Sequence, residues 1–121
     1  MLDHLSLQCT HLEASCAFYD QVLGTLGASR VMEFGDAVGY GIGAKPGFWI
    51  SQSAVAGSFR ESHVAFVADD RDAVRAFHAA AVELGAHVLH EPREWPEYHP
   101  GYFAAFVRDP DGNNVEAVCH A

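Results

Sequence analysis

The chain has 121 residues, half of them hydrophobic, which is enough for one globular domain with a buried core and excludes a disordered chain. Its net charge is −9 with only seven lysines and arginines, which excludes the basic surface that nucleic acids and anionic membranes require. No apolar run approaches the roughly 18 residues of a membrane-spanning helix, and the start lacks the basic segment of a signal peptide. Three cysteines without paired spacing indicate reduced thiols and a cytoplasmic protein.

The first half predicts a strand, a helix and three further strands. Residues 4–10 alternate between apolar and polar side chains, which indicates a half-buried strand. Apolar residues then recur at helical spacing, beginning with a capping box at Thr10 and Glu13 and ending at Gly24 or Gly27. The three further strands are expected at about 28–35, 37–43 and 47–53.

The second half shows the same order. An apolar strand at 63–68 opens with His63, and the helix that follows is capped by Asp69 or Asp70 and ended by Gly85. Its further strands are expected at about 86–90, 102–108 and 113–119, with the turn DPDGNN (109–114) before the last of them. The proline-rich segment 91–101 is the one long loop and a candidate lid over a site.

The two halves align as an internal repeat. The stretch 3–28 can be laid over 62–86, so that His4 falls on His63, and each half reads β-α-β-β-β. We therefore expect a single domain over 1–121, built from modules at about 1–57 and 58–121 that are joined near 55–61.

Paired modules of this kind, each opening with a strand histidine, together with the ending DPDGNNVEAV, resemble the vicinal oxygen chelate superfamily. That superfamily contains glyoxalase I, extradiol dioxygenases, fosfomycin-resistance transferases and bleomycin-resistance proteins. The resemblance covers essentially the whole chain. It implies an α+β fold of two βαβββ modules whose curved mixed sheets form a pair of cupped half-barrels, with the helices on the convex face. It also implies a homodimer in which a cup takes one module from each subunit.

The resemblance further implies one divalent metal ion in the cup, Zn, Ni, Fe or Mn, bound by His4, His63 and Glu116. Glu116 is a charged residue inside an apolar strand, and burying an unpaired carboxylate is costly, so a metal or a basic partner is expected beside it. Two imidazoles and one carboxylate leave coordination positions open for a substrate. The expected function is therefore Lewis-acid catalysis on a small oxygen-chelating substrate, of the lyase, isomerase or dioxygenase type.

One position departs from glyoxalase I. Aligning Gly47 with Gly112 places Ser51 opposite Glu116, where glyoxalase I carries a fourth ligand. Serine is a poor ligand for a divalent ion, so the three-ligand branches, the dioxygenases and the fosfomycin-type transferases, are favoured. The small number of lysines and arginines speaks against a phosphonate substrate.

The dioxygenase pattern is also incomplete. His99 has the spacing of its histidine, but Phe106 stands at the place of its tyrosine and cannot donate a hydrogen bond. Tyr98 and Tyr102 are the candidates to replace that tyrosine. His99 is the candidate general base, and Glu116 is a second candidate for the same role.

The remaining candidates are residues that would contact a substrate. Trp49 shares strand parity with Ser51 and either stacks on a substrate or belongs to the core. The substrate-contacting set is Trp49, Ser51, Tyr98 and Tyr102. The other histidines are expected on the surface: His11, His78, His87, His90 and His120.

Two other functions stay open on the sequence. One is a metal-free binding protein that sequesters a small molecule in the cup, as bleomycin-resistance proteins do. The other is an inert domain whose ligand set is vestigial. Metal content separates both from the enzyme hypothesis.

Overall fold

A computed structural model gives the fold of the chain and describes residues 1–54, 57 and 60–121. The expected link near 55–61 falls largely on residues outside this described part. Eight strands and two helices follow one another in the order β1 (Leu5–Cys9), α1 (Leu12–Gly24), β2 (Ser29–Phe34), β3 (Ala37–Gly41), β4 (Phe48–Gln52), β5 (His63–Val67), α2 (Arg71–Glu83), β6 (Val88–Glu94), β7 (Phe103–Arg108) and β8 (Asn114–Cys119). Within the described ranges, neither helix is long and apolar enough to cross a membrane.

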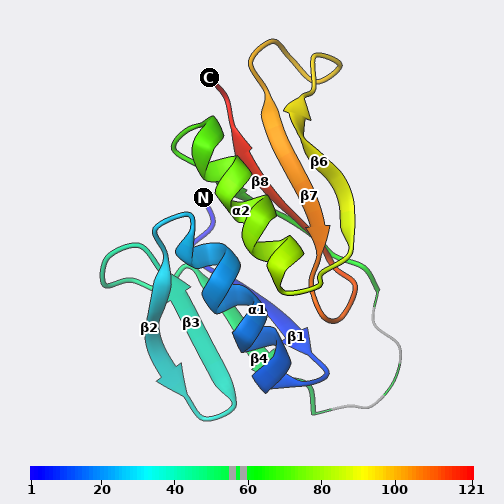
Figure 1. Cartoon of the computed structure of the whole chain (residues 1–121). Helices are drawn as coiled ribbons and strands as arrows, with labels where there is room; N and C mark the ends of the chain where they lie inside the picture. Colours follow the sequence, from blue (N-terminus) through cyan, green and yellow to red (C-terminus); the bar gives the residue numbers. More distant parts are fainter. Residues whose placement is uncertain (55–56, 58–59) are drawn as a thin grey trace.

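The strands form two four-stranded mixed sheets with the same topology (Figure 1). The first sheet has the order β1-β4-β3-β2 and the second β5-β8-β7-β6. In each sheet the first strand of the module runs parallel to the last one, and the other pairs are antiparallel. This confirms the α+β fold of two βαβββ modules. Over the described residues the two sheets remain open and do not close into a barrel.

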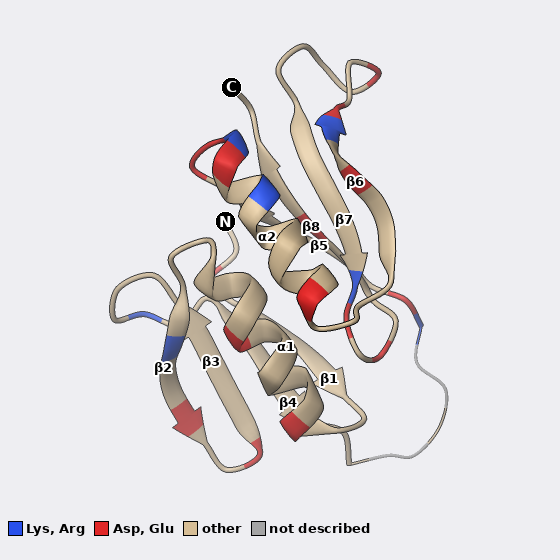
Figure 2. Cartoon of the chain, in the orientation of Figure 1, with Lys and Arg blue, Asp and Glu red and all other residues tan. Residues whose placement is uncertain are grey.

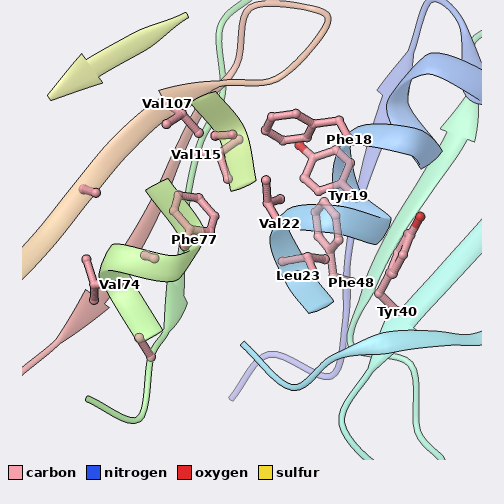
Figure 3. Packing of buried hydrophobic residues seen from close by; sticks show 14 of the residues in the cluster. Phe18, Tyr19, Val22, Leu23, Tyr40, Phe48, Val74, Phe77, Val107 and Val115 are labelled. Atoms are coloured by element: carbon pink, nitrogen blue, oxygen red, sulfur yellow. The ribbon is translucent and has the colours of Figure 1, made fainter. Parts of the chain in front are cut away.

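The two helices lie side by side and cover the same side of the two sheets (Figure 1). The main core fills the space between helices and sheets, with the α1 side chains facing those of α2 and the second sheet (Figure 3). Phe48 of β4 meets Phe66 of β5 edge to face, with ring centroids 5.0 Å apart, so the core is continuous between the modules. Lysines and arginines are dispersed over α2, β2, β6 and the loops without gathering on one face (Figure 2).

The beginning of α1 differs from the prediction. Its N-cap is His11, whose side chain makes no cap hydrogen bond, so the expected Thr10 capping box is wrong. The Thr10 amide donates to the Asp111 carboxylate at 3.1 Å, and the Leu12 amide donates to Oε1 of Gln52 at 2.9 Å. Residues distant in the sequence therefore satisfy the first amides of the helix, which no local pattern can indicate.

The beginning of α2 follows the prediction. Asp70 is its N-cap, and the Asp70 carboxylate accepts a hydrogen bond from the Ala73 amide at 2.8 Å. Gly85, with φ of 76°, follows the last turn, where a left-handed conformation suits glycine.

The proline-rich segment is shorter as a loop than expected. Strand β6 continues to Glu94, where Arg93 pairs with Ala104 and Glu94 with Phe103. The strand tolerates Pro92 because β6 is the edge of its sheet and its pairing is interrupted by register shifts. The remaining loop is closed at its base by a 2.8 Å hydrogen bond from the Trp95 amide to the Tyr102 carbonyl.

Candidate functional site

Neighbouring strands of the second sheet bring His63 and Glu116 together. His63 opens β5, and Glu116 lies in β8, where it pairs with Ala65, two residues after His63. Val115 and Ala117 belong to the core under the helices, so by strand alternation Glu116 lies on the opposite, open face of the sheet. Glu116 is only 2% exposed, whereas the His63 side chain is 49% exposed.

The contact between the two side chains requires a proton or a metal ion between them. His63 Nε2 lies 2.9 Å from Glu116 Oε1, and His63 Nδ1 lies 3.2 Å from the Asn114 carbonyl. A carbonyl oxygen only accepts, so Nδ1 carries the hydrogen, and in a neutral His63 the Nε2 lone pair faces the carboxylate. Two lone pairs at this distance need either a proton between them, on the imidazole or on the carboxyl group, or a metal ion.

Tyr102 completes the polar cluster. Its hydroxyl donates a hydrogen bond to Glu116 Oε2, the carboxylate oxygen that His63 does not contact. Burial, and then the hydrogen bond to Glu116, raise the pKa of Tyr102 well above its ordinary value, so the phenol keeps its proton. A tyrosine hydroxyl therefore lies at the candidate site although Phe106 occupies the position of the family tyrosine.

An aromatic cluster surrounds the carboxylate. The Phe106 ring stacks on the His63 ring, with centroids 6.0 Å apart, and Trp95 packs edge-on against Phe106 at 5.1 Å. His90, expected at the surface, also touches Trp95 with its ring, at 4.9 Å. Over the described part of the chain, the Glu116 carboxylate has no lysine or arginine within ion-pair distance. Its only charged partner candidate there is His63.

His4 lies apart from this cluster within one chain. Its Nδ1 is 2.8 Å from an Asp3 oxygen, and Lys45 Nζ lies 2.7 Å from the other Asp3 oxygen. The hydrogen bonds from Lys45 and from His4 lower the pKa of Asp3 to about 2. No three His, Cys, Asp or Glu side chains of the described residues are grouped so that they would hold a metal ion within a single chain.

The strand register changes the equivalence between the modules. His63 pairs with Asn114, two residues before Glu116. Leu5 pairs with Phe48, so the same register places His4 beside Gly47, two residues before Trp49. Matching His4 with His63 therefore puts Trp49, not Ser51, at the place of Glu116. Neither side chain supplies a carboxylate, so the first module offers no acidic ligand at either position.

Trp49 and Ser51 are both half-buried on the open face of the first sheet. The Trp49 ring lies over Gly39, where an added Cβ would stand 2.9 Å from Trp49 Cζ2. This ring is therefore held by packing within its own sheet.

The loop residues reach the site through Tyr102. The Tyr98 side chain is 58% exposed, and its ring lies parallel to Trp95 with centroids 5.7 Å apart. His99 Nε2 is 2.9 Å from His120 Nδ1, and both imidazoles contact the Tyr102 ring, with centroids 5.3 and 5.2 Å away. His120 was expected only as a surface residue. It is exposed, but the parity of Glu116, Val118 and His120 indicates that it shares the face of the site.

A separate cavity lies where the modules meet on the helix side. It has a volume of about 340 Å³ and an almost entirely apolar lining that includes Leu23, Phe48 and Phe66. None of the candidate site residues lines it.

Comparisons with known proteins agree with this fold. The model of the Glyoxalase/Bleomycin resistance protein/Dioxygenase superfamily matches residues 1–117. A glyoxalase/bleomycin resistance protein from Albidiferax ferrireducens is 29% identical, with a TM-score of 0.83 over 95% of each chain. A lactoylglutathione lyase from Agrobacterium tumefaciens is 26% identical, with a TM-score of 0.69 over 95% of this chain and 90% of that one. A glyoxalase I variant from Zea mays, 21% identical with a TM-score of 0.73, shares the fold over 97% of this chain and 45% of its own. No protein of curated function was found to match the sequence.

Proposed function

The chain belongs to the Glyoxalase/Bleomycin resistance protein/Dioxygenase superfamily, and we propose that it is a metal-dependent enzyme acting on a small oxygen-chelating substrate. The observation that carries the proposal is the 2.9 Å contact between His63 Nε2 and Glu116 Oε1 on the open face of the second sheet. Members of this superfamily commonly use a divalent metal ion.

The side chains present fit such an ion. His63 is fixed by its Nδ1 contact to the Asn114 carbonyl, an arrangement typical of metal-binding imidazoles, and its free nitrogen points at the carboxylate. Tyr102 fixes the other carboxylate oxygen. We assign His63 and Glu116 as two ligands and His4 of a second copy as the third, because His4 does not reach them within one chain. Zn, Ni, Fe and Mn all suit such a mixed set of ligands.

The protein residues have separable tasks in the proposed reaction. A bound divalent ion supplies a Lewis acid that polarises a substrate oxygen. Tyr102 orients the Glu116 carboxylate, and Phe106 and Trp95 keep water from its buried side. Glu116 is a candidate proton acceptor. Trp49, Ser51 and Tyr98 are proposed to contact the substrate, since each is partly exposed.

A homodimer follows from this assignment, since each site needs His4 from another copy. Its pairing would bring the open face of one first module to the second module of its partner. All three cysteines are free and buried, which supports the proposal of a reducing, cytoplasmic location.

Metal content tests the proposal. Protein purified without chelator should carry a near-stoichiometric divalent metal by elemental mass spectrometry. The metal should be lost in Glu116→Gln and His63→Ala and retained in the control His78→Ala, a change on the outer surface of α2. Iron or manganese would favour oxygen chemistry, and zinc or nickel isomerisation. A wild-type protein that neither holds nor takes up metal would contradict the proposal and favour a metal-free binding protein.

Mixing variants tests the shared site. Neither His4→Ala nor Glu116→Gln should bind metal alone. After subunit exchange, half of the dimers contain one of each chain, and one of their two sites is intact, so about a quarter of the wild-type metal should return. If no metal returns although subunits have exchanged, His4 is not contributed by a second copy.

A further inference from the structure

His99 and His120 form a second histidine pair at the open end of the Tyr102–Glu116 cluster. His120 follows β8 directly, and the loop that carries His99 passes closely against it. Gly101, with φ of +84°, allows this approach, because a Cβ there would lie 3.3 Å from the His120 carbonyl oxygen. A hydrogen bond from the Trp95 amide to the Tyr102 carbonyl closes the loop, so His99 is held in place.

The hydrogen bonds fix where the protons of the neutral pair lie. His99 Nδ1 is 2.8 Å from the Pro100 carbonyl, which only accepts, so Nδ1 carries the hydrogen of His99. His99 Nε2 is therefore an acceptor, and its 2.9 Å partner, His120 Nδ1, must be the donor. His120 Nε2 is then left with a lone pair, and it has no hydrogen-bond partner among the described residues.

This order of hydrogen bonds leaves His99 without a free nitrogen lone pair, so His120 is the histidine that can accept a proton. Both nitrogens of His99 are occupied within the protein, whereas the exposed His120 offers an unoccupied basic nitrogen. The same order is kept when His120 takes up a proton. Its Nδ1–H still donates to His99 Nε2, and His99 donates in turn to Pro100, so the new proton goes to His120 Nε2 without any change in these hydrogen bonds.

We propose that His120, rather than Glu116 itself, is the proton acceptor of the Glu116 site and that His99 is the positioning residue that fixes its tautomer. The role in the reaction rests on the proposed function, whereas the tautomers do not. In the step, an acidic C–H or O–H bond of the substrate breaks, and its proton forms a new bond to His120 Nε2. The electron pair stays on the substrate as an enolate or alkoxide, and the proton returns when the product forms.

Nitrogen NMR tests the tautomers without a substrate. In long-range 1H–15N spectra of the full chain at about pH 9, where ordinary imidazoles are neutral, His99 and His120 should both appear as Nδ1–H tautomers. His78, on the surface of α2, should show the Nε2–H form that histidine prefers in water. His99→Phe should return His120 to the Nε2–H form, and His99→Gln, whose side-chain oxygen accepts a hydrogen bond, should preserve Nδ1–H. A wild-type His120 in the Nε2–H form would overturn the proposal.

Acylation by diethyl pyrocarbonate tests the reactivity of the same nitrogen. His120 should react several-fold faster than His11, which is also exposed and makes no side-chain cap hydrogen bond, by peptide mass spectrometry. His99→Phe should remove this difference, while His99→Gln restores most of it. Equal rates in the wild-type protein would refute a His120 whose Nε2 lone pair is fixed and accessible. The Glu116→Gln variant separates this proposal from the metal site, because it should lose metal and keep both the tautomers and the rates. Metal binding to Glu116→Gln that is lost on adding His120→Ala would instead identify the pair as a metal site and overturn the proton-acceptor role.

Discussion

The two sheets have one topology and two different open faces. Each helix has 13 residues, and the strand orders correspond, so the two modules share one arrangement of helix and sheet. On the open face, Gly39 pairs with Trp49 in the first sheet, whereas Phe106 pairs with Glu116 at the corresponding place in the second. A glycine beside an indole ring in the first sheet thus corresponds to a phenyl ring beside a carboxylate in the second.

Because of this difference, the open face of the first sheet is filled by packing and that of the second sheet carries polar groups. In the first sheet the Trp49 ring folds over Gly39, and the strand surface is closed by the sheet itself. In the second sheet Phe106 turns to His63 and leaves the Glu116 carboxylate to two polar partners. A repeat of the fold therefore does not imply a repeat of the ligands, and the second module carries most of the candidate site.

The hydrogen bonds that join the two modules differ in strength, and removing the strongest of them should have the largest effect on stability. The buried Asp109 carboxylate, in the turn between β7 and β8, accepts a 2.7 Å hydrogen bond from Tyr19 of α1 and a 2.9 Å bond from the Asn113 amide. Asp109→Ala would leave these buried donors unpaired. We expect a loss of about 3 kcal/mol in the free energy of unfolding, measured by urea denaturation.

The matched control for Asp109 is Asp111→Ala in the same turn. Asp111 accepts from the Thr10 amide at an exposed position, so its loss should cost about 1 kcal/mol or less. Equal losses for the two variants would mean that Asp109 does not join the modules more strongly than a surface contact does.

Gly39→Ala would test the packing of the first open face. A methyl group at this position would lie 2.8 Å from Pro46 Cβ and 2.9 Å from Trp49 Cζ2, so the indole ring must move. We expect a destabilisation of about 1–3 kcal/mol by urea denaturation, the usual range for overpacking. Gly47→Ala is the control, since nothing lies within 4 Å of its added Cβ. If the two variants are equally stable, the Trp49 ring is not held in place by packing over Gly39.

Part of this comparison was readable from the sequence. Strand alternation and the internal repeat predicted the order of the elements, because that order follows from local periodicity. That His63 and Glu116 lie together was implied only by the family resemblance. The register was not readable. In the strand register Gly47 corresponds to Asn114, two residues after Gly112, so aligning the two glycines selected Ser51, while strand pairing selects Trp49.

The partners of the site residues were harder still to predict. Tyr102 contacts Glu116, and His99 contacts His120, from one loop. The path of this loop depends on the extension of β6 and on the close approach at Gly101. The only sequence signal for His120 was its parity with Glu116 across the end of the strand. Contacts of this kind depend on tertiary geometry, which a one-dimensional pattern does not contain.

An ion pair joins the first helix to its sheet, and the pH dependence of the free energy of unfolding tests its contribution. The Arg30 guanidinium donates to both Asp20 oxygens, at 2.9 and 2.8 Å, and lowers the pKa of Asp20, with a further hydrogen bond from Tyr40. A lowered folded-state pKa contributes stability above the ordinary carboxyl pKa of about 3.9, and this contribution is lost as pH falls through the folded value. Arg30→Gln should cost about 0.5 kcal/mol at pH 7, because both side chains are over one-third exposed, and the difference from wild type should vanish in acid.

A double-mutant cycle supplies the control for that tie. In the Asp20→Asn background, Arg30→Gln should have little effect on the free energy of unfolding at any pH. A cost that persists unchanged at low pH would show that Arg30 stabilises β2 by packing, and that its ion pair with Asp20 is not what holds α1 to its sheet.

The second helix is fastened by an aromatic ring, and the smallest effect is expected there. Arg71 and Arg75 of α2 place their guanidinium carbons 4.7 and 5.0 Å from the centroid of the Phe103 ring, which lies in β7. Arg75→Gln should lower the free energy of unfolding by about 0.5 kcal/mol, the value of a partly exposed cation–π contact. Arg75→Lys should retain part of it. Because the attraction acts on a ring and not on a carboxylate, the loss should be the same at pH 7 and in acid, where the Arg30 effect disappears. A loss at Arg75 that follows pH would assign it to the ion pair with Asp72 within α2, 3.0 Å away, and the contact of Arg75 with the Phe103 ring would not be what stabilises the helix.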